Sequence, residues 1–212
     1  MTTSTRGPSE ARERLLARAG GLFYGEGIRS VGVDRLVSEA RVTRATFYRH
    51  FPSKEDLVVA YLRAADAQVR ERVRESIDGA ESAADALRAV ATSIAEDLSR
   101  PEFRGCAFLR AAAEFPDPAD PVHREVVAHR AWFVSVLRDL FTQVYRDEGP
   151  GARPGRAAQH FLMLRDGAMS SGAIDEVADV GDTFRRGVEG LITVVHVASD
   201  GPDAPTRPHL PV

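Results

Sequence analysis

The sequence predicts an all-α protein in which three N-terminal helices precede a larger helical body. Apolar residues recur at helical spacing along most of the chain, and Gly and Pro interrupt that pattern where helices would end. Strand signals are scarce beyond the N-terminal unit. The chain has 212 residues, of which 43% are hydrophobic, so it can bury a sizeable core in one or two domains.

The first helix is expected over residues 11–26, where an apolar stripe runs up to Gly27. Residues 32–51, GVDRLVSEARVTRATFYRHF, then predict two short helices joined by a tight turn. The first of these, over residues 33–40, carries its apolar side chains at the i, i+3, i+4, i+7 spacing of one helical face. This geometry is typical of a helix-turn-helix that reads DNA.

The second short helix, over residues 44–50, is expected to present a face rich in hydrogen-bond donors. Thr43 is placed to cap this helix, while Phe47 and Phe51 fall four apart and can pack inward. The side chains left outside are Thr43, Arg44, Thr46, Tyr48, Arg49 and His50, with Lys54 just beyond them. Such a face suits a groove lined by phosphates and base edges. For an isolated segment, an ordinary hairpin with a solvated basic face is the competing interpretation.

The string LFYGEGIRSVGVDRLVSEARVTRATFYRHFPSKEDLVVAYL, residues 22–62, resembles the DNA-binding domain of TetR-family transcriptional regulators. Its most specific part is TFYRHFPSKEDL. The resemblance implies a three-helix DNA-binding domain over residues 8–62, with its helix-turn-helix over 32–51. It further implies that residues 63–198 form a helical domain for effector binding and dimerisation.

The resemblance also implies roles for single residues. Those matching Thr43, Arg44 and Thr46 approach bases or nearby phosphates. Tyr48 and His50 would hold the DNA backbone, and Lys54 would reach a phosphate from the following helix. The candidate DNA-binding set is therefore Arg41, Thr43, Arg44, Thr46, Tyr48, Arg49, His50 and Lys54.

Two positions depart from the family pattern. Gly32 stands where the family usually has Thr or Ser, so the cap supplies no hydroxyl for a phosphate. Arg41 stands where a Gly usually makes the turn. If that turn needs a positive φ, Arg41 carries a strain of about 1 kcal/mol, although its charge could add a contact to the DNA backbone.

The charge is distributed unevenly along the chain. The net charge is −3, yet residues 1–57 carry ten basic and seven acidic side chains, which leaves an acidic remainder. A basic N-terminal unit on an acidic body suits a protein that touches DNA at one end.

Beyond the N-terminal unit, helices are expected over residues 53–79, 83–99, 106–114, 122–147, 156–174 and 181–197. Residues 199–212 are expected to form a disordered tail. The last two helices carry more small and apolar residues than a water-facing pair should: Leu162, Leu164, Gly167, Ala168, Ser171, Gly172, Val188, Leu191, Ile192 and Val195. They predict a four-helix interface in a homodimer, whose two reading helices would lie about 34–36 Å apart on a palindromic operator.

A pocket for an unidentified small-molecule effector is expected between the long helices of the body. Its candidate lining is Phe108, Phe115, His129, Trp132, Phe133, Phe161 and Met163. Aromatic and Met residues at helical spacing belong to a core more often than to a ligand site. His129 and Trp132 are the better candidates, because each carries a polar group that could orient a ligand.

Other function classes find little support in the sequence. There is no Gly-rich phosphate loop and no GxSxG motif, so we expect neither an enzyme nor a cofactor. Glu125 and His129 share a helical face, but solvated helix residues are favoured there over a metal site. The single Cys106 excludes an intrachain disulfide and is expected to be a small buried hydrophobe rather than a redox sensor. With no membrane span or signal peptide apparent, a soluble cytoplasmic protein is expected. Arginine outnumbers lysine 27 to 1, which suggests a high-GC bacterial genome.

Together these features predict a sequence-specific, DNA-binding transcriptional regulator, with a ligand-responsive dimeric repressor favoured by the resemblance. The effector would act by a population shift that moves the reading helices out of register with the major groove. The alternative is a helical interaction module that uses its helix-turn-helix to bind a protein partner. Steep salt dependence and competition by duplex DNA would distinguish the two.

Overall fold

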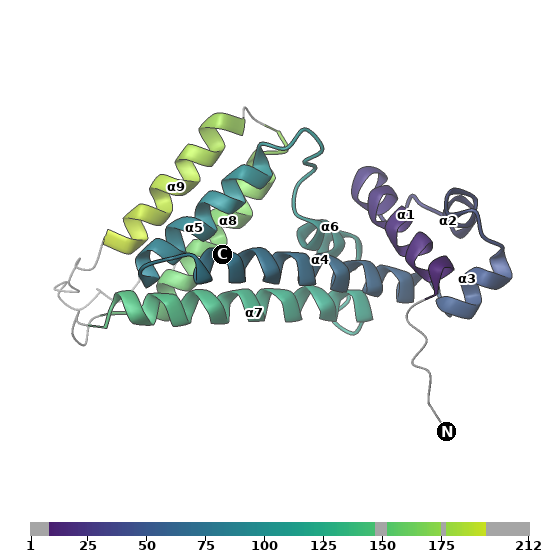
Figure 1. Ribbon diagram of the computed structural model, residues 1–212, viewed down its shortest axis with the longest axis horizontal. Coiled ribbons are helices and arrows are strands. Elements are labelled where there is room, and N and C mark those ends of the chain that lie inside the picture. The colour runs from purple at the N-terminus through teal and green to yellow at the C-terminus, as the bar shows by residue number, and fades with distance from the viewer. Residues whose placement is uncertain (1–8, 147–151, 175–176, 194–212) are drawn as a thin grey trace, which may run out of the picture.

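The computed structural model describes residues 9–146, 152–174 and 177–193, and every regular element within them is a helix, as the sequence predicts. We call the first three helices the head and the others the body. The head comprises α1 (Glu10–Glu26), α2 (Val33–Ala40) and α3 (Arg44–His50). The body comprises α4 (Lys54–Asp78), α5 (Ala83–Leu98), α6 (Ala107–Glu114), α7 (Pro121–Val144), α8 (Pro154–Ser171) and α9 (Val177–Thr193). The head lies at one end of an elongated molecule, and α4 runs from it along the body (Figure 1).

The head is held together by a small apolar core. Leu15 of α1, Leu36 of α2 and Phe47 of α3 are each fully buried. The Phe47 ring also meets those of Tyr48 and Phe51, with centroid distances of 5.2 and 6.2 Å. Burying one such side chain contributes about 2–3 kcal/mol, so this core fixes α3 on the surface of the head.

Capping residues and a tight turn set the ends of the helices in the head and the start of α4. Thr43 caps α3, since its Oγ1 accepts the backbone N–H of Thr46 at 3.1 Å. Ser53 and Asp56 form a reciprocal capping box at the start of α4. The turn between α2 and α3 places Arg41 in the left-handed region, with φ 52°, where a side chain costs about 1 kcal/mol.

The body is a bundle in which α5 packs against α9, α7 against α8, and α4 against both α5 and α7. Phe133, Phe161 and Phe184 form an edge-to-face series through its core, with successive ring centroids 6.2 and 5.6 Å apart. Within the described part of the chain, no helix is long and apolar enough to cross a membrane.

The last helix begins earlier than predicted, at Val177 instead of residue 181. Gly181 is an interior position of α9, not its start. A Cβ built on Gly181 would lie 3.4 Å from the Cβ of Ala95, so the glycine allows α9 to approach α5 closely. The predicted interface residue Val195 and the predicted tail over 199–212 lie outside the described residues.

A hydrogen-bonded joint connects α6 to the end of α1. The Glu114 carboxylate accepts the backbone N–H groups of Ile28, at 3.0 Å, and Arg29, at 2.6 Å. The Tyr24 hydroxyl donates to the Gly105 carbonyl at 3.0 Å and accepts the backbone N–H of Arg104 at 2.9 Å. The first pair of bonds joins α6 to the backbone that follows α1, and the second pair joins α1 to the loop before α6. Together they fix the orientation of the head relative to α6.

Candidate nucleic-acid interface

The outward face of α3 presents the donor side chains that the sequence places there. Thr43, Arg44 and Arg49 are exposed, and Tyr48 keeps 47% of its surface accessible. The buried Phe47 anchors the opposite side of the helix. A short helix with one buried and one donor-bearing side can enter a major groove as a rigid unit.

Thr43 and Thr46 lie together at the start of α3. Their hydroxyl oxygens are 3.0 Å apart, and Thr43 Oγ1 already accepts the N–H of Thr46. Thr46 is half-buried, whereas Thr43 is exposed. The cap therefore fixes both hydroxyls before any nucleic acid binds, which lowers the entropic cost of contacts from either residue.

The structure also exposes Ala45, which is absent from the predicted set because its side chain donates no hydrogen bond. Ala45 stands between Arg44 and Thr46 in the first turn of α3. A methyl group at such a position can contact the methyl group of thymine. Its place next to two candidate residues is the signal that could have identified it.

The side chain of Arg44 pairs with Asp34 of α2, at 3.3 Å between Arg44 Nη1 and Asp34 Oδ1. Both side chains are well exposed, so the pair is worth no more than about 1 kcal/mol. Arg44 is thus oriented by a weak partner that DNA could replace.

His50 and Lys54 lie at the far end of α3. His50 Nε2 is 3.0 Å from the Oγ of Ser9, the residue that caps α1. Lys54 is the first residue of α4 and half-buried. Burial lowers the pKa of Lys54, opposed by the nearby carboxylates of Glu55 and Glu114. An ammonium group at a helix N-terminus forms a favourable site for a phosphate, because the ammonium charge and the positive end of the helix dipole both attract the anion.

In the body, the structure divides the predicted pocket residues among several places. A cavity of about 40 Å³ lies between α4, α5, α7 and α8, and His129 and Phe133 are in its wall. Phe108 stacks on the His129 ring with a centroid distance of 3.7 Å, and Trp132 lies 6.0 Å from it. Phe161 belongs to the aromatic series of the core.

Of the seven predicted pocket residues, only His129 and Phe133 line this cavity. Phe115 and Met163 lie elsewhere in the molecule. Phe115 lies at the joint with the head, where the Arg29 guanidinium stands 5.5 Å over its ring. Met163 is 68% exposed and faces a groove between α8 and α9. Met163 is apolar and has helical spacing from its neighbours, but neither property shows whether its side of α8 faces the body or the solvent.

The cavity wall also contains Arg165 of α8, which is absent from the predicted pocket residues. Arg165 is only 6% exposed. It stands four residues from both Phe161 and Met169 on the buried stripe of α8. A charged residue on an otherwise apolar helical stripe is the signal that could have identified it.

His129 is buried and held in one orientation, so the expectation of a solvated residue at this position is wrong. Its Nδ1 lies 2.7 Å from Oδ1 of Asp66 on α4. Burial lowers the pKa of His129 below its ordinary value, although the hydrogen bond to Asp66 acts in the opposite direction. Glu125 instead accepts Nε–H of Arg63 at 3.0 Å, so Glu125 and His129 have separate partners. Within the described ranges, no cluster of three or more His, Cys, Asp or Glu side chains could hold a metal ion.

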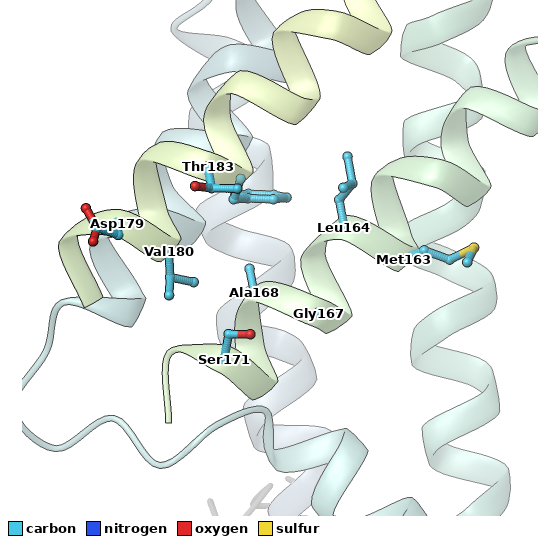
Figure 2. A pocket seen from close by; sticks show the side chains of 9 residues that line it. Met163, Leu164, Gly167, Ala168, Ser171, Asp179, Val180 and Thr183 are labelled. Atoms are coloured by element: carbon cyan, nitrogen blue, oxygen red, sulfur yellow. The ribbon is translucent and has the colours of Figure 1, made fainter. Parts of the chain in front are cut away.

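A groove of about 500 Å³ runs between α8 and α9 (Figure 2). It is lined by Met163, Leu164, Gly167, Ala168, Ser171, Asp179, Val180, Thr183 and Phe184. Leu164 is 38% exposed, and a Cβ on Gly167 would meet nothing within 4 Å. Large exposed apolar side chains beside an open glycine are typical of a helix surface that receives another helix.

A three-helix head with a donor-bearing α3 defines a helix-turn-helix DNA-binding protein. Residues 15–61 match the family model described as bacterial regulatory proteins, tetR family. A solved structure, the TetR-family transcriptional regulator SCO4454 from Streptomyces coelicolor, is 50% identical to the chain. Its TM-score is 0.81, and the match covers 86% of this chain and 94% of that one. The chain therefore belongs to the TetR family of transcriptional regulators.

More distant similarities extend over most of the chain. The HTH-type transcriptional regulator YjdC of Escherichia coli is 23% identical over 192 residues, which cover 90% of this chain and 97% of that protein. The solved structure of a TetR-family regulator from Cytophaga hutchinsonii is 18% identical, with a TM-score of 0.78 over 91% of this chain and 99% of that one. At this identity the likeness supports the fold alone.

Replacing Lys54 or Tyr48 by Ala is expected to weaken binding to all DNA sequences by a similar factor. If Lys54 contacts one phosphate, loss of its charge should lower the slope of log affinity against log salt by about one for each protomer, whereas loss of the neutral Tyr48 hydroxyl should leave the slope unchanged. Fluorescence anisotropy at several salt concentrations measures this slope. Arg74→Ala, which removes an exposed cation from the far part of α4, is the matched control. An unchanged slope for Lys54→Ala would count against its phosphate contact.

Replacing Asp34 by Asn is expected to strengthen DNA binding about two- to fivefold. The change removes the ion pair with Asp34 that Arg44 would have to break in order to contact DNA. Competition anisotropy at low salt measures the gain. Asp85→Asn, which breaks a similar exposed pair with Arg88 in the body, controls for net charge. Weaker binding by Asp34→Asn would mean that Asp34 positions Arg44 for DNA instead of competing with it.

Proposed function

We propose that the protein is a ligand-responsive repressor that binds a palindromic operator as a homodimer. The donor-bearing face of α3, fixed on a head at one end of α4, is the observation that carries this proposal. In the proposed complex with DNA, Thr43, Arg44 and Thr46 contact bases or adjacent phosphates. The residues that hold the DNA backbone are Arg41, Tyr48, Arg49, His50 and Lys54.

The groove between α8 and α9 is the proposed dimer interface. Met163 and Leu164 are large apolar side chains left exposed on α8, and Gly167 leaves open space one turn further on. A second copy of α8 and α9 would cover these side chains and complete a four-helix interface around a two-fold axis. That axis would present two copies of α3 to successive major grooves, which supports a palindromic operator.

In this proposal the chain has two domains. Residues 8–62 form the DNA-binding domain, and residues 63–198 form the domain for effector binding and dimerisation. Helix α4 belongs to both, since its first turn carries Lys54 and its later turns contribute Val69 and Ser76 to the cavity wall. A ligand that widens the cavity would displace α4 and turn the heads out of register with the DNA.

The test is a titration of the full-length protein with fluorescent duplexes that tile the DNA beside its own gene. Two salt concentrations and a scrambled duplex serve as controls, and light scattering gives the number of protomers. The proposal requires tight binding to one palindromic tile by two protomers, with a steep salt dependence. Weak and equal binding to every tile would favour distant operators or a protein partner for the helix-turn-helix.

A further inference from the structure

We propose that the cavity between α4, α5, α7 and α8 binds a small organic anion, a carboxylate on an apolar body, with Arg165 as its ionic anchor. This inference rests on the proposed function in one respect, because it names the chemical class of the effector. The binding site itself is argued from the groups that surround the cavity.

Arg165 is a buried cation with few partners. Its Nη1 donates to Asp166 Oδ1 at 3.0 Å, and its Nη2 donates to the Cys106 thiol at 3.3 Å. A guanidinium carries five N–H donors and stays charged, and a thiol is a weak acceptor. A second carboxylate, supplied by a ligand, would give this buried charge a stronger partner.

Arginines outnumber carboxylates around the cavity. Asp166 is shared between Arg165 and Arg130, whose Nη1 lies 2.7 Å from Asp166 Oδ2. Asp97, in the wall, is likewise shared between two arginines. Arg72 Nη2 lies 3.1 Å from Asp97 Oδ2, and Arg100 Nη2 lies 3.0 Å from Asp97 Oδ1.

The remaining ionisable groups do not offset this excess. Asp66, which faces His129 from α4, is also paired with Arg70 at 2.5 Å. Burial favours the uncharged form of His129, so its ring adds little charge at neutral pH. Asp97 Oδ1 is buried and accepts no hydrogen bond, so the wall also holds an open acceptor. The excess of arginines nevertheless favours an anionic group beside Arg165.

Half of the residues that line the cavity are apolar: Val69, Val73, Val90, Ile94, Phe133 and Met169. The others are Arg72, Ser76, Ser93, Asp97, His129 and Arg165. Inorganic anions are strongly hydrated and gain nothing from such a wall, whereas an aromatic or aliphatic body would bury its surface there. A carboxylate that pairs with Arg165 and an organic body that packs on the apolar half of the wall together describe an organic acid.

The cavity must widen to accept such a ligand. Its volume of about 40 Å³ is room for a few water molecules at about 10–15 Å³ each. Met169, an unbranched and adaptable side chain, lies in the wall and can move. A ligand that enters would therefore push apart the helices that enclose the cavity, including α4, which leads to the head.

Arg165 also connects the cavity to the joint with the head. Cys106, which accepts from Arg165 Nη2, is the residue immediately before α6. The last residue of α6 is Glu114, which holds the backbone of Ile28 and Arg29. A ligand carboxylate that takes Nη2 from the thiol would release the start of α6 and alter the support of the head.

Trp132 provides a direct readout of binding, because it is the only tryptophan and its ring lies 6.0 Å from those of His129 and Phe133. The full-length protein is titrated with benzoate, phenylacetate and hexanoate, and with the three corresponding neutral amides. Separate titrations with phosphate and with chloride test whether inorganic anions bind. We expect saturable fluorescence changes with at least one carboxylate, at least about tenfold weaker binding of its amide, and no saturable response to the inorganic ions.

Two variants locate the site. Arg165→Gln removes the anchor, and Ser93→Val fills the cavity from α5 while leaving Arg165 in place. Each should weaken carboxylate binding by about tenfold or more, whereas Arg156→Gln on the exposed side of α8 should not. If Arg165→Gln does not fold, the result for Ser93→Val alone decides whether the carboxylate occupies this cavity.

Three results would overturn the assignment: no response to any of the three carboxylates, equal affinity for acids and amides, or saturable binding of phosphate or chloride alone. DNA release, measured in parallel, separates this inference from the proposed function. Neutral compounds that bind and release DNA would refute the anion and leave a ligand-responsive repressor. Carboxylates that bind at Arg165 without any effect on DNA would support the site and refute its role as the effector site.

Discussion

A Gly167→Leu variant is expected to stay folded but to lose both dimerisation and tight DNA binding, with a fall in operator affinity of about 100-fold or more. The change adds a side chain where the protomer has open space, since a Cβ there meets nothing within 4 Å. Leu is also the better helix former by almost 1 kcal/mol. In the proposed dimer the same side chain would stand between two packed helix pairs and force them apart.

The loss of affinity follows from valency. A dimer binds its second half-site at a high effective concentration, and this gain of about 10²–10⁴ disappears when the protomers separate. Light scattering gives the oligomeric state, and anisotropy with a palindromic duplex gives the affinity. Gly155→Leu, also open in the protomer but at the other end of α8, is the matched control. A Gly167→Leu protein that remains dimeric would show that the groove is not the dimer interface.

The second large effect is expected for Glu114→Ala at the joint between the head and α6. The carboxylate accepts two backbone N–H groups, those of Ile28 and Arg29. Hydrogen bonds to a charged group contribute about 1.5–3 kcal/mol, and their loss leaves the half-buried N–H of Ile28 without its partner. We expect a loss of about 2 kcal/mol in stability and a melting temperature lower by about 4–8 °C.

DNA binding should weaken together with stability, because the head loses a contact that fixes its orientation. Calorimetry gives the melting temperature, and anisotropy gives the affinity for DNA. Glu75→Ala, on the exposed surface of α4, removes a carboxylate without disturbing the joint. Melting and DNA affinity that match the Glu75→Ala control would refute the structural role of Glu114.

The head could be predicted almost completely from the sequence, because its signals are local. Thr43 and Ser53 start helices by accepting N–H groups only three residues away. The sequence leaves a positive φ at Arg41 open, because it shows only that Arg stands where the family usually has Gly, and the structure has φ 52° there. Phe47 and Phe51 reveal the inner side of α3 by their spacing alone.

The body was less predictable, because its features depend on contacts between distant segments. Asp66 and His129 are 63 positions apart, yet they lie within hydrogen-bond distance. Spacing placed Met163 in the pocket, but the packing of α7 against α8 turns that side chain outward and Arg165 inward. Gly181, which the sequence suggests as a helix start, is explained only by the close approach of Ala95.

The measurement that tests the central claim most directly is selection of binding sites from a pool of random-sequence DNA duplexes by the full-length protein. If two copies of α3 read DNA around a two-fold axis, the enriched sequences should contain an inverted repeat with half-sites one helical turn apart. Arg44→Ala should then relax the enriched sequence at a symmetric pair of positions. A pool with no enriched motif, or with a single unrepeated half-site, would contradict the dimeric reading of a palindromic operator.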